Sequence, residues 1–160
     1  MGTVKETLAS RMTKPQIIRL VGSFVAISVV CFLAFECGAP LFMASFGASA
    51  VVIFAMPKSP AARIQNVIGG HIVSATVGVI LVMVLGLTWY TAALAAAIAI
   101  GLMVCLDFVH PPGGATALIA VIGMEDWTFI LAPVAVGAII MYAIGYVTNM
   151  ACRKYEEEKS

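Results

Sequence analysis

The segment Asp107–Ala117, which reads DFVHPPGGATA, interrupts a long apolar region of the sequence. Pro111 and Pro112 lack backbone N–H groups, and a proline pushes the residue before it towards an extended conformation. His110 and Pro111 are therefore expected to lie outside any helix. The two glycines that follow permit tight backbone geometry. The pattern predicts an extended segment that leads into a short helix over 114–123, whose free N–H groups and positive dipole end favour an anion.

The composition places this segment in a membrane protein. Of the 160 residues, 62% are hydrophobic and 11% are charged, and the mean hydropathy is +1.06. A soluble domain is nearer half apolar and a quarter charged. We therefore expect an integral membrane protein, with the lipid bilayer as its surroundings. The net charge of +1 gives no electrostatic footprint for nucleic acid, so no nucleic-acid partner is expected.

No pattern of catalytic or metal-binding residues stands out. The four cysteines are scattered without metal-ligand spacing, so we interpret them as packing residues and expect neither a metal nor a cofactor. No nucleophile motif, phosphate loop or HExxH motif occurs. The chain is therefore not expected to be an enzyme, and an intramembrane hydrolase is the weaker alternative.

Apolar stretches alternate with polar breaks in a regular order. They predict an all-α membrane domain over 17–150, between a cytoplasmic N-terminal segment (1–16) and a polar cytoplasmic tail (151–160). Residues 88–91 are expected to form a tight link. A hydrocarbon core of about 30 Å needs about 20 helical residues. The expected long helices are 17–35, 64–87, 92–106 and 128–150, and the expected short ones are 41–56 and 114–123.

The two halves of this domain resemble one another. At an offset of 67, seven positions between 47 and 79 are identical to their counterparts. We predict two repeats, 17–87 and 91–150, each a long helix, a broken short helix and a long helix. Paired, interrupted segments of this kind indicate the binding site of a transporter. Five glycines are expected to permit close helix packing: Gly69, Gly70, Gly78, Gly137 and Gly145.

The loop charges predict the topology. Six crossings place the basic loops and both termini in the cytoplasm and the acidic turn outside, as the positive-inside rule requires. The protein would then lie in the cell (inner) membrane. Three crossings per repeat would make the repeats inverted, with the N-termini of the short helices meeting near the midplane. Four crossings, with re-entrant short segments, is the alternative. The decisive charges are Lys58, Arg63, Arg153 and Lys154 inside, and Glu125 and Asp126 outside.

Two facing helix N-termini would create a positive potential inside the membrane. The segment lacks the carboxylate cluster that a divalent cation needs, so the expected solute is a small anion or a small neutral polar molecule. The candidate binding residues are Ser45, Gly47, Ala48, Ser49, His110, Gly113, Gly114, Ala115 and Thr116.

Three ionisable residues are candidates for proton transfer or gating. His71 and His110 titrate near physiological pH, although each is also compatible with a purely packing role. Asp107 can neutralise His110 or hold the loop, and a structural role at the cytoplasmic face is favoured because an acid hinders anions.

The segment HPP followed by GGATA resembles the signature of the HPP family of integral membrane proteins. ASFGASAV at 44–51, the PKSP turn at 57–60 and Gly69-Gly70-His71 are similar to that family too. The resemblance covers about residues 17–150. Plant plastid and cyanobacterial members are implicated in nitrite transport, which implies nitrite or a similar small anion here. A membrane-embedded anion sensor or assembly subunit is the alternative. Channel and proton-coupled carrier both remain open, and a homo-oligomer is expected.

Overall fold

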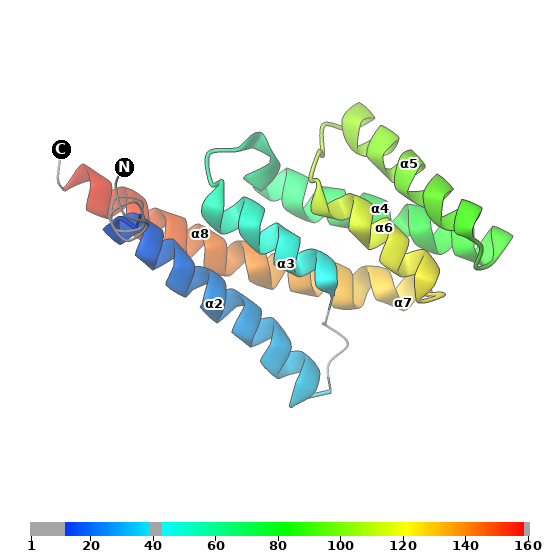
Figure 1. Cartoon of the computed structure of the whole chain (residues 1–160), viewed down its shortest axis with the longest axis horizontal. Coiled ribbons are helices and arrows are strands. Elements are labelled where there is room, and N and C mark those ends of the chain that lie inside the picture. Colours follow the sequence, from blue (N-terminus) through cyan, green and yellow to red (C-terminus); the bar gives the residue numbers. More distant parts are fainter. Residues whose placement is uncertain (1–11, 39–42, 159–160) are drawn as a thin grey trace, which may run out of the picture.

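The computed structural model describes residues 12–38 and 43–158, and this part of the chain is helical without any strand. Successive segments alternate in direction along the long axis of the molecule (Figure 1). The segments are α2 (Lys14–Phe35), α3 (Ala44–Ala50) with its π-helical continuation η1 (Val51–Ala55), the 3-10 turn η2 (Pro60–Ala62), α4 (Ile64–Leu85), α5 (Trp89–Cys105), α6 (Pro112–Ile122), α7 (Trp127–Phe129), the π-helical η3 (Ile130–Ala135) and α8 (Val136–Glu157).

Short polar residues set several of the helix ends. The hydroxyl of Thr88 accepts a hydrogen bond from the Thr91 N–H at 3.1 Å and begins α5. The Asp126 carboxylate accepts from the Thr128 N–H at 2.8 Å and begins α7. Such caps satisfy N–H groups that have no partner inside the helix. Gly86, with φ of +71°, ends α4.

Several predicted helix ends are wrong by a few residues. The first helix begins at Lys14 with Pro15 in its first turn, and the short helix α6 begins at Pro112. Proline is tolerated in a first turn because those N–H groups need no helical partner. Trp89 belongs to α5, so the predicted link 88–91 is shorter. The last helix continues to Glu157 rather than ending near 150, so part of the predicted tail is helical.

Within residues 12–38 and 43–158, three helical stretches are long and apolar enough to cross a membrane: Lys14–Phe35, Ile64–Leu85 and Trp127–Glu157. The last of these is kinked at Ala132, whose φ of −139° and ψ of 121° are not helical. The shorter apolar helices are Ala44–Ala55, Trp89–Cys105 and Pro112–Ile122. The predicted order of long, short and long segments is present in the first half, whereas in the second half the first helix, α5, has 17 residues and belongs to the shorter ones. The alternating directions agree with six crossings, while the number of crossings and the orientation stay predictions.

Close packing on glycine joins the two halves. In α4, side-chain space at Gly70 is filled by Phe108 and His110, and at Gly78 by Ala117 and Ala120 of α6. In α8, the space at Gly137 is filled by Phe46 of α3, and at Gly145 by Ile53 of η1. With Gly69, which lies 2.9 Å from the Phe108 ring measured from an added Cβ, the predicted packing role of these five glycines is confirmed.

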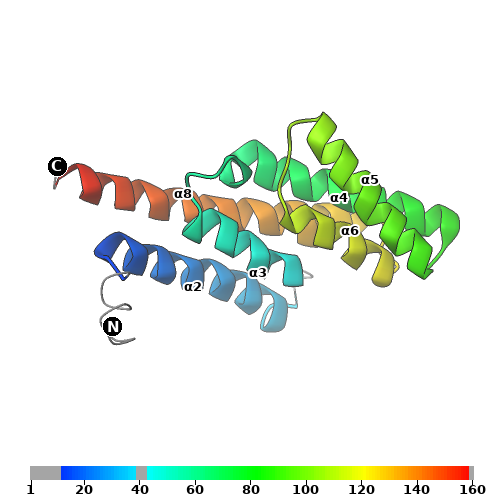
Figure 2. The same ribbon diagram turned by 45° about the horizontal axis from the view of Figure 1, so that its top comes forward.

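These contacts are reciprocal between the predicted repeats. The third helix of the first half, α4, packs on the short helix of the second half, and α8 packs on the short helix of the first. Helix α2 completes the assembly by lying along α8 (Figure 2). Such reciprocity is expected of related repeats, and their inverted arrangement stays a prediction.

Candidate functional site: a buried histidine–hydroxyl network

Five polar side chains meet where α3, α4 and the start of α6 come together. Each is at most 2% exposed, and together they form a polar island in an apolar helical protein. No buried side-chain nitrogen or oxygen in the described part of the chain lacks a hydrogen-bond partner. The five are Ser45 and Ser49 of α3, His71 of α4, His110 of the α5–α6 loop and Thr116 of α6.

Ser49 bridges the two histidines. Its Oγ lies 2.7 Å from Nε2 of His71 and 3.0 Å from Nε2 of His110. The imidazole rings are 4.9 Å apart between centroids, at an interplanar angle of 61°. A single hydroxyl therefore joins the only two imidazoles in the sequence.

Thr116 extends the network on the other side of His71. Its Oγ1 lies 2.7 Å from Nδ1 of His71, and it donates towards Oγ of Ser45 at 3.1 Å. The carbonyl of Pro112, 3.4 Å away, offers Thr116 a second acceptor. The hydrogen-bonded chain thus runs from α3 through α6 and α4 and back to α3.

His110 ends the chain at the opposite side. Its Nδ1 lies 2.9 Å from the carbonyl oxygen of Ala61, in the turn before α4. Asn66 fixes the same loop, because its side-chain amide donates to the carbonyl of Val109 at 3.0 Å. The extended residues before the proline pair are therefore held by two contacts with the start of α4.

Two glycines make this convergence possible. A Cβ added at Gly70 would lie 2.7 Å from Cβ of His110, and one added at Gly113 would lie 3.0 Å from the carbonyl oxygen of Gly70. Only hydrogen atoms fit between these backbones, which lets α4 and the start of α6 approach closely. His110 and Pro111 lie outside the helices, as predicted, but Pro111, which is the N-cap of α6, has φ of −50° and ψ of −38° and is therefore not extended.

The first turns of α3 and α6 lie side by side rather than end to end. Ser45, at the start of α3, contacts Thr116, while Ser49, one turn later, contacts His110. The two helices therefore run in opposite directions and overlap. In addition, the N–H of Gly113 donates to the His110 carbonyl at 2.8 Å and that of Gly114 to the Pro111 carbonyl at 3.2 Å. These two N–H groups are used within the turn, so the polar side-chain groups gathered here are hydroxyls and imidazoles.

The predicted binding residues divide into two groups. The buried group joins or adjoins the network and consists of Ser45, Ser49, His110, Gly113 and Thr116. The outward group consists of Gly47, Ala48, Gly114 and Ala115, of which Gly114 is half-buried and the others are exposed. No atom lies within 4 Å of the position of an added Cβ at Gly47 or Gly114. Small residues thus face outward from both short helices.

Asp107 does not join the site. It is exposed, has φ of +56°, and forms no ion pair with His110, which is fully buried. His71, by contrast, lies at the centre of the network. Within the described ranges 12–38 and 43–158, no group of three or more metal-ligating side chains occurs.

A basic hollow lies beside the end of the hydrogen-bonded network at which His110 contacts the Ala61 carbonyl. It has a volume of about 360 Å³ and contains the cations Arg19, Lys58 and Arg153, with one acid, Glu156. Arg19 Nε donates to Oδ1 of Asn149 at 3.3 Å, and its guanidinium lies 3.7 Å from Glu156. Ala62, next to the His110 acceptor Ala61, also lines the hollow.

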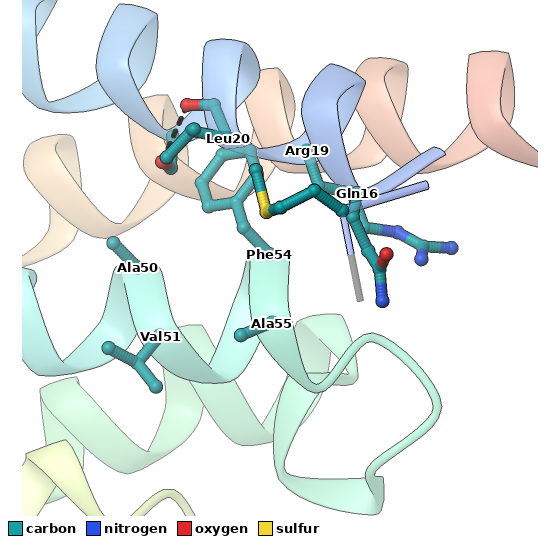
Figure 3. A pocket seen from close by; sticks show the side chains of 9 residues that line it. Gln16, Arg19, Leu20, Ala50, Val51, Phe54 and Ala55 are labelled. Atoms are coloured by element: carbon teal, nitrogen blue, oxygen red, sulfur yellow. Dashed lines mark hydrogen bonds between the residues drawn. The ribbon is translucent and has the colours of Figure 1, made fainter. Parts of the chain in front are cut away.

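A second, more apolar hollow separates α2 from α3 and η1. It has a volume of about 450 Å³, and Arg19 lines this hollow as well. Figure 3 shows Phe54 and Val51 on one wall and Leu20 on the other. Arg19 is thus the one side chain shared by the two hollows.

Sequence reasoning did not foresee that Ser49 joins both histidines, or that Ala61 is the acceptor for His110. Ser49 and His71 are 22 residues apart and belong to different helices. The available signal was the rarity of histidine: both copies lie in apolar surroundings, where an ionisable side chain needs a polar partner. Ser49 and Thr116, equivalent at the offset of 67, were the nearest hydroxyl candidates.

The apolar helices and their buried polar network define an integral membrane protein. Residues 9–156 match the family described as HPP, transmembrane region, so the chain belongs to this family. It is similar to two transmembrane proteins of Dictyostelium discoideum, with 40% and 42% identity over 144 residues. The alignments cover 82% of this chain, and the chain spans about half the length of these relatives, 50% and 46%. No solved structure matches.

Proposed function

We propose that this protein moves a small inorganic anion, nitrite first among the candidates, across the membrane at the junction of α3, α4 and α6. The observation that carries the proposal is the network of Ser45, Ser49, His71, His110 and Thr116, buried within apolar helices. Polar groups at such depth are costly and are typical of solute pathways. Membership of the HPP transmembrane family agrees with a function within the membrane.

The network suits a small anion that binds weakly. Its hydroxyl and imidazole groups can donate hydrogen bonds, and no carboxylate contacts either histidine in the described part of the chain. No lysine or arginine belongs to the network, so a bound anion is not held by a permanent full charge. A permeating ion must leave its site as readily as it enters, which favours such neutral donors.

Access is proposed along the outward faces of the two short helices. Gly47 and Gly114 have open space on their side-chain side and lie close in sequence to Ser49 and Thr116 of the network. The basic hollow with Lys58 and Arg153 adds a positive potential that raises the local anion concentration near one end of the network.

The test is anion flux into proteoliposomes of the purified protein, with nitrite, nitrate, formate and chloride compared. Gly114→Leu places a large side chain in open space on the proposed path. Gly101→Leu is the matched control, because Gly101 also has open space but lies on the exposed side of α5, away from the network. We expect nitrite flux in the wild type and in the control, and loss of flux in Gly114→Leu.

Two results decide against the proposal. Equal flux in both variants removes the outward face of α6 from the path. Liposomes that stay sealed to every anion, with protein shown to be folded by circular dichroism, favour the sensor or assembly role instead.

A further inference from the structure

The bridge formed by Ser49 has a consequence for proton positions. A hydroxyl carries one proton, so Ser49 can donate to only one of three partners: Nε2 of His71 at 2.7 Å, Nε2 of His110 at 3.0 Å, or the Ser45 carbonyl oxygen at 3.2 Å. An imidazole nitrogen without a proton has Ser49 as its donor here, so the protonation of the histidines determines which way the Ser49 proton points.

The Ala61 carbonyl sets the starting point, because it can only accept. Nδ1 of His110, 2.9 Å away, must carry a proton. In neutral His110, Nε2 is then bare and accepts from Ser49. Ser49 in turn accepts from Nε2–H of His71, whose bare Nδ1 accepts from the hydroxyl of Thr116 at 2.7 Å. One arrangement of protons satisfies both ring nitrogens of each histidine when both imidazoles are neutral.

A second arrangement exists when His110 carries an additional proton. Nε2–H of His110 then donates to Ser49, and Ser49 donates to Nε2 of His71. Nδ1–H of His71 donates to Thr116, and Thr116 donates to Oγ of Ser45 at 3.1 Å. The bonds of Ser49 with both histidines and of His71 with Thr116 reverse their direction, while Nδ1–H of His110 keeps its bond to the Ala61 carbonyl.

The two arrangements differ by one proton, and each proton transfer between them can be written out. Thr116 receives a proton from hydronium or from the protonated solute, and passes its own proton to Nδ1 of His71. His71 passes its Nε2 proton to Ser49, and Ser49 passes its proton to Nε2 of His110. Thr116, His71 and Ser49 end neutral, His71 has changed tautomer, and His110 is an imidazolium. Only O–H and N–H bonds break and form.

We propose that Thr116, His71, Ser49 and His110 form a proton relay that couples anion movement to proton movement. The coupling rests on the anion transport proposed above, whereas the relay itself does not depend on it. The reason for coupling is the charge balance. An imidazolium at His110 has no acidic partner among the described residues, so an anion beside it stabilises the charge, and the charge stabilises the anion.

The charged groups around the network do not provide an alternative counter-ion. The described segments α3, α5 and α6 contain no lysine, arginine, aspartate or glutamate, and α4 contains none besides its flanking residue Arg63. Arg63, Lys58 and Asp107 lie in exposed turns around the site. His71 and His110 are therefore the titratable groups that face one another at the centre of the relay.

The relay can be tested without any transport measurement, by NMR of the protonation state and tautomer of the two histidines. Because the chain has two histidines, ¹⁵N-histidine labelling gives two imidazoles, which the His71→Gln variant assigns. At neutral pH we expect His110 as the Nδ1–H tautomer and His71 as the Nε2–H tautomer. On acidification we expect His110 to become an imidazolium while His71 changes to the Nδ1–H tautomer. His71 keeping its tautomer while His110 is protonated would overturn the relay.

The second experiment tests the coupling in proteoliposomes. Ser49→Ala removes the bridge and keeps both imidazoles, and Ser23→Ala is the matched control, since its hydroxyl bonds only the Leu20 carbonyl of its own helix. We expect Ser49→Ala to lose roughly tenfold or more of nitrite uptake driven by a pH gradient. Ser49→Thr, which keeps a hydroxyl at this position, should restore the driven uptake.

The outcomes separate the two proposals. Driven uptake unchanged in Ser49→Ala overturns the coupling, even where wild-type flux supports transport. A coupled change of both histidines in a protein without any flux keeps the relay and removes the transport function. Driven uptake that is lost in Ser49→Ala and is not restored in Ser49→Thr overturns the role of the Ser49 hydroxyl as a proton carrier.

Discussion

Gly70 lies directly against His110: a Cβ added at Gly70 would come within 2.7 Å of Cβ of His110 and 2.8 Å of the Phe108 carbonyl oxygen. The next residue along α4 is His71, the other imidazole of the network. Two consecutive residues of α4 therefore have linked roles: His71 is one histidine of the network, and Gly70 leaves the space that the other histidine, His110, occupies. The register of α4 against the α5–α6 loop therefore determines whether the two imidazoles can share Ser49.

Gly70→Ala should displace the loop and separate the imidazoles. The added methyl group meets backbone and a buried side chain, and overpacking of this kind costs about 1–3 kcal/mol. We expect lower thermal stability in detergent and altered signals from both histidines. Gly101→Ala, at an open position on α5, should change neither. Wild-type melting and wild-type imidazole signals in Gly70→Ala would show that the loop adapts at no cost.

Thr116→Val should weaken the network at its other end. Valine has nearly the shape of threonine but leaves Nδ1 of His71 without its partner at 2.7 Å. A buried polar group without a partner costs about 1–3 kcal/mol. Thr76→Val is the matched control, because the Thr76 hydroxyl bonds only the Ile72 carbonyl within α4. Thermal unfolding of the two variants checks the difference, and equal losses of stability would contradict the prediction.

The sequence predicts the helices and the polar segments well, because each depends on neighbours in the chain. Apolar length marks α2 and α4, and the proline pair marks the break before α6. The pairing of Ser49 with both histidines depends instead on how α3, α4 and α6 pack. Gly47 and Ser49 are two residues apart in a predicted site, but one faces outward and the other is buried. Side-chain direction on a helix requires knowledge of its neighbours, which a single sequence does not contain.

The basic hollow yields a prediction that depends on salt. Reversing charge at Lys58 and Arg153 removes positive potential from the hollow without touching the buried network. We expect the double variant Lys58→Glu/Arg153→Glu to lower nitrite flux by roughly threefold to tenfold at low ionic strength. At about 1 M salt the difference should vanish, because screening acts over about 3 Å there.

Lys154→Glu is the control for this measurement, since Lys154 is exposed on the same helix and does not line the hollow. A salt-independent loss of flux in the double variant would indicate a direct structural effect. An equal loss in Lys154→Glu would indicate a general effect of surface charge.

The adjacent acids Glu125 and Asp126, in the turn before α7, should have pKa values that are shifted in opposite directions. Burial, followed by the charge of Asp126, raises the pKa of Glu125. Hydrogen bonds from Thr128 lower the pKa of Asp126. The Asp126 cap therefore contributes stability above the ordinary pKa of aspartate, and this contribution is lost as the pH falls through the lowered pKa. Glu125 has the opposite sign: its contribution is present at low pH and is lost as the pH rises through its raised pKa.

Asp126→Asn keeps a side-chain acceptor for the cap and removes the charge. The pKa of Glu125 should then fall part of the way towards its ordinary value, because the larger contribution from burial remains. Carboxyl ¹³C NMR titration measures this change. An unchanged Glu125 pKa in the variant would show that the neighbouring charge has no effect on it.

The orientation of the chain can be tested at two loops. Six crossings place Lys58 in the cytoplasm, whereas four crossings with re-entrant short helices place it outside. Glu125 lies outside in both arrangements and serves as the positive control. Single cysteines at Lys58 and Glu125, in a chain whose four native cysteines are replaced, can be treated with a membrane-impermeant maleimide on intact cells.

We expect the Glu125→Cys variant to be labelled in intact cells and the Lys58→Cys variant to be labelled only after the membrane is opened. The expectation follows from the positive-inside rule and agrees with the alternating directions of the helices (Figure 1). Labelling of Lys58→Cys from outside would establish re-entrant short helices. Because Lys58 lines the same hollow as Arg153, that result would also contradict a cytoplasmic position for the C-terminal end of α8.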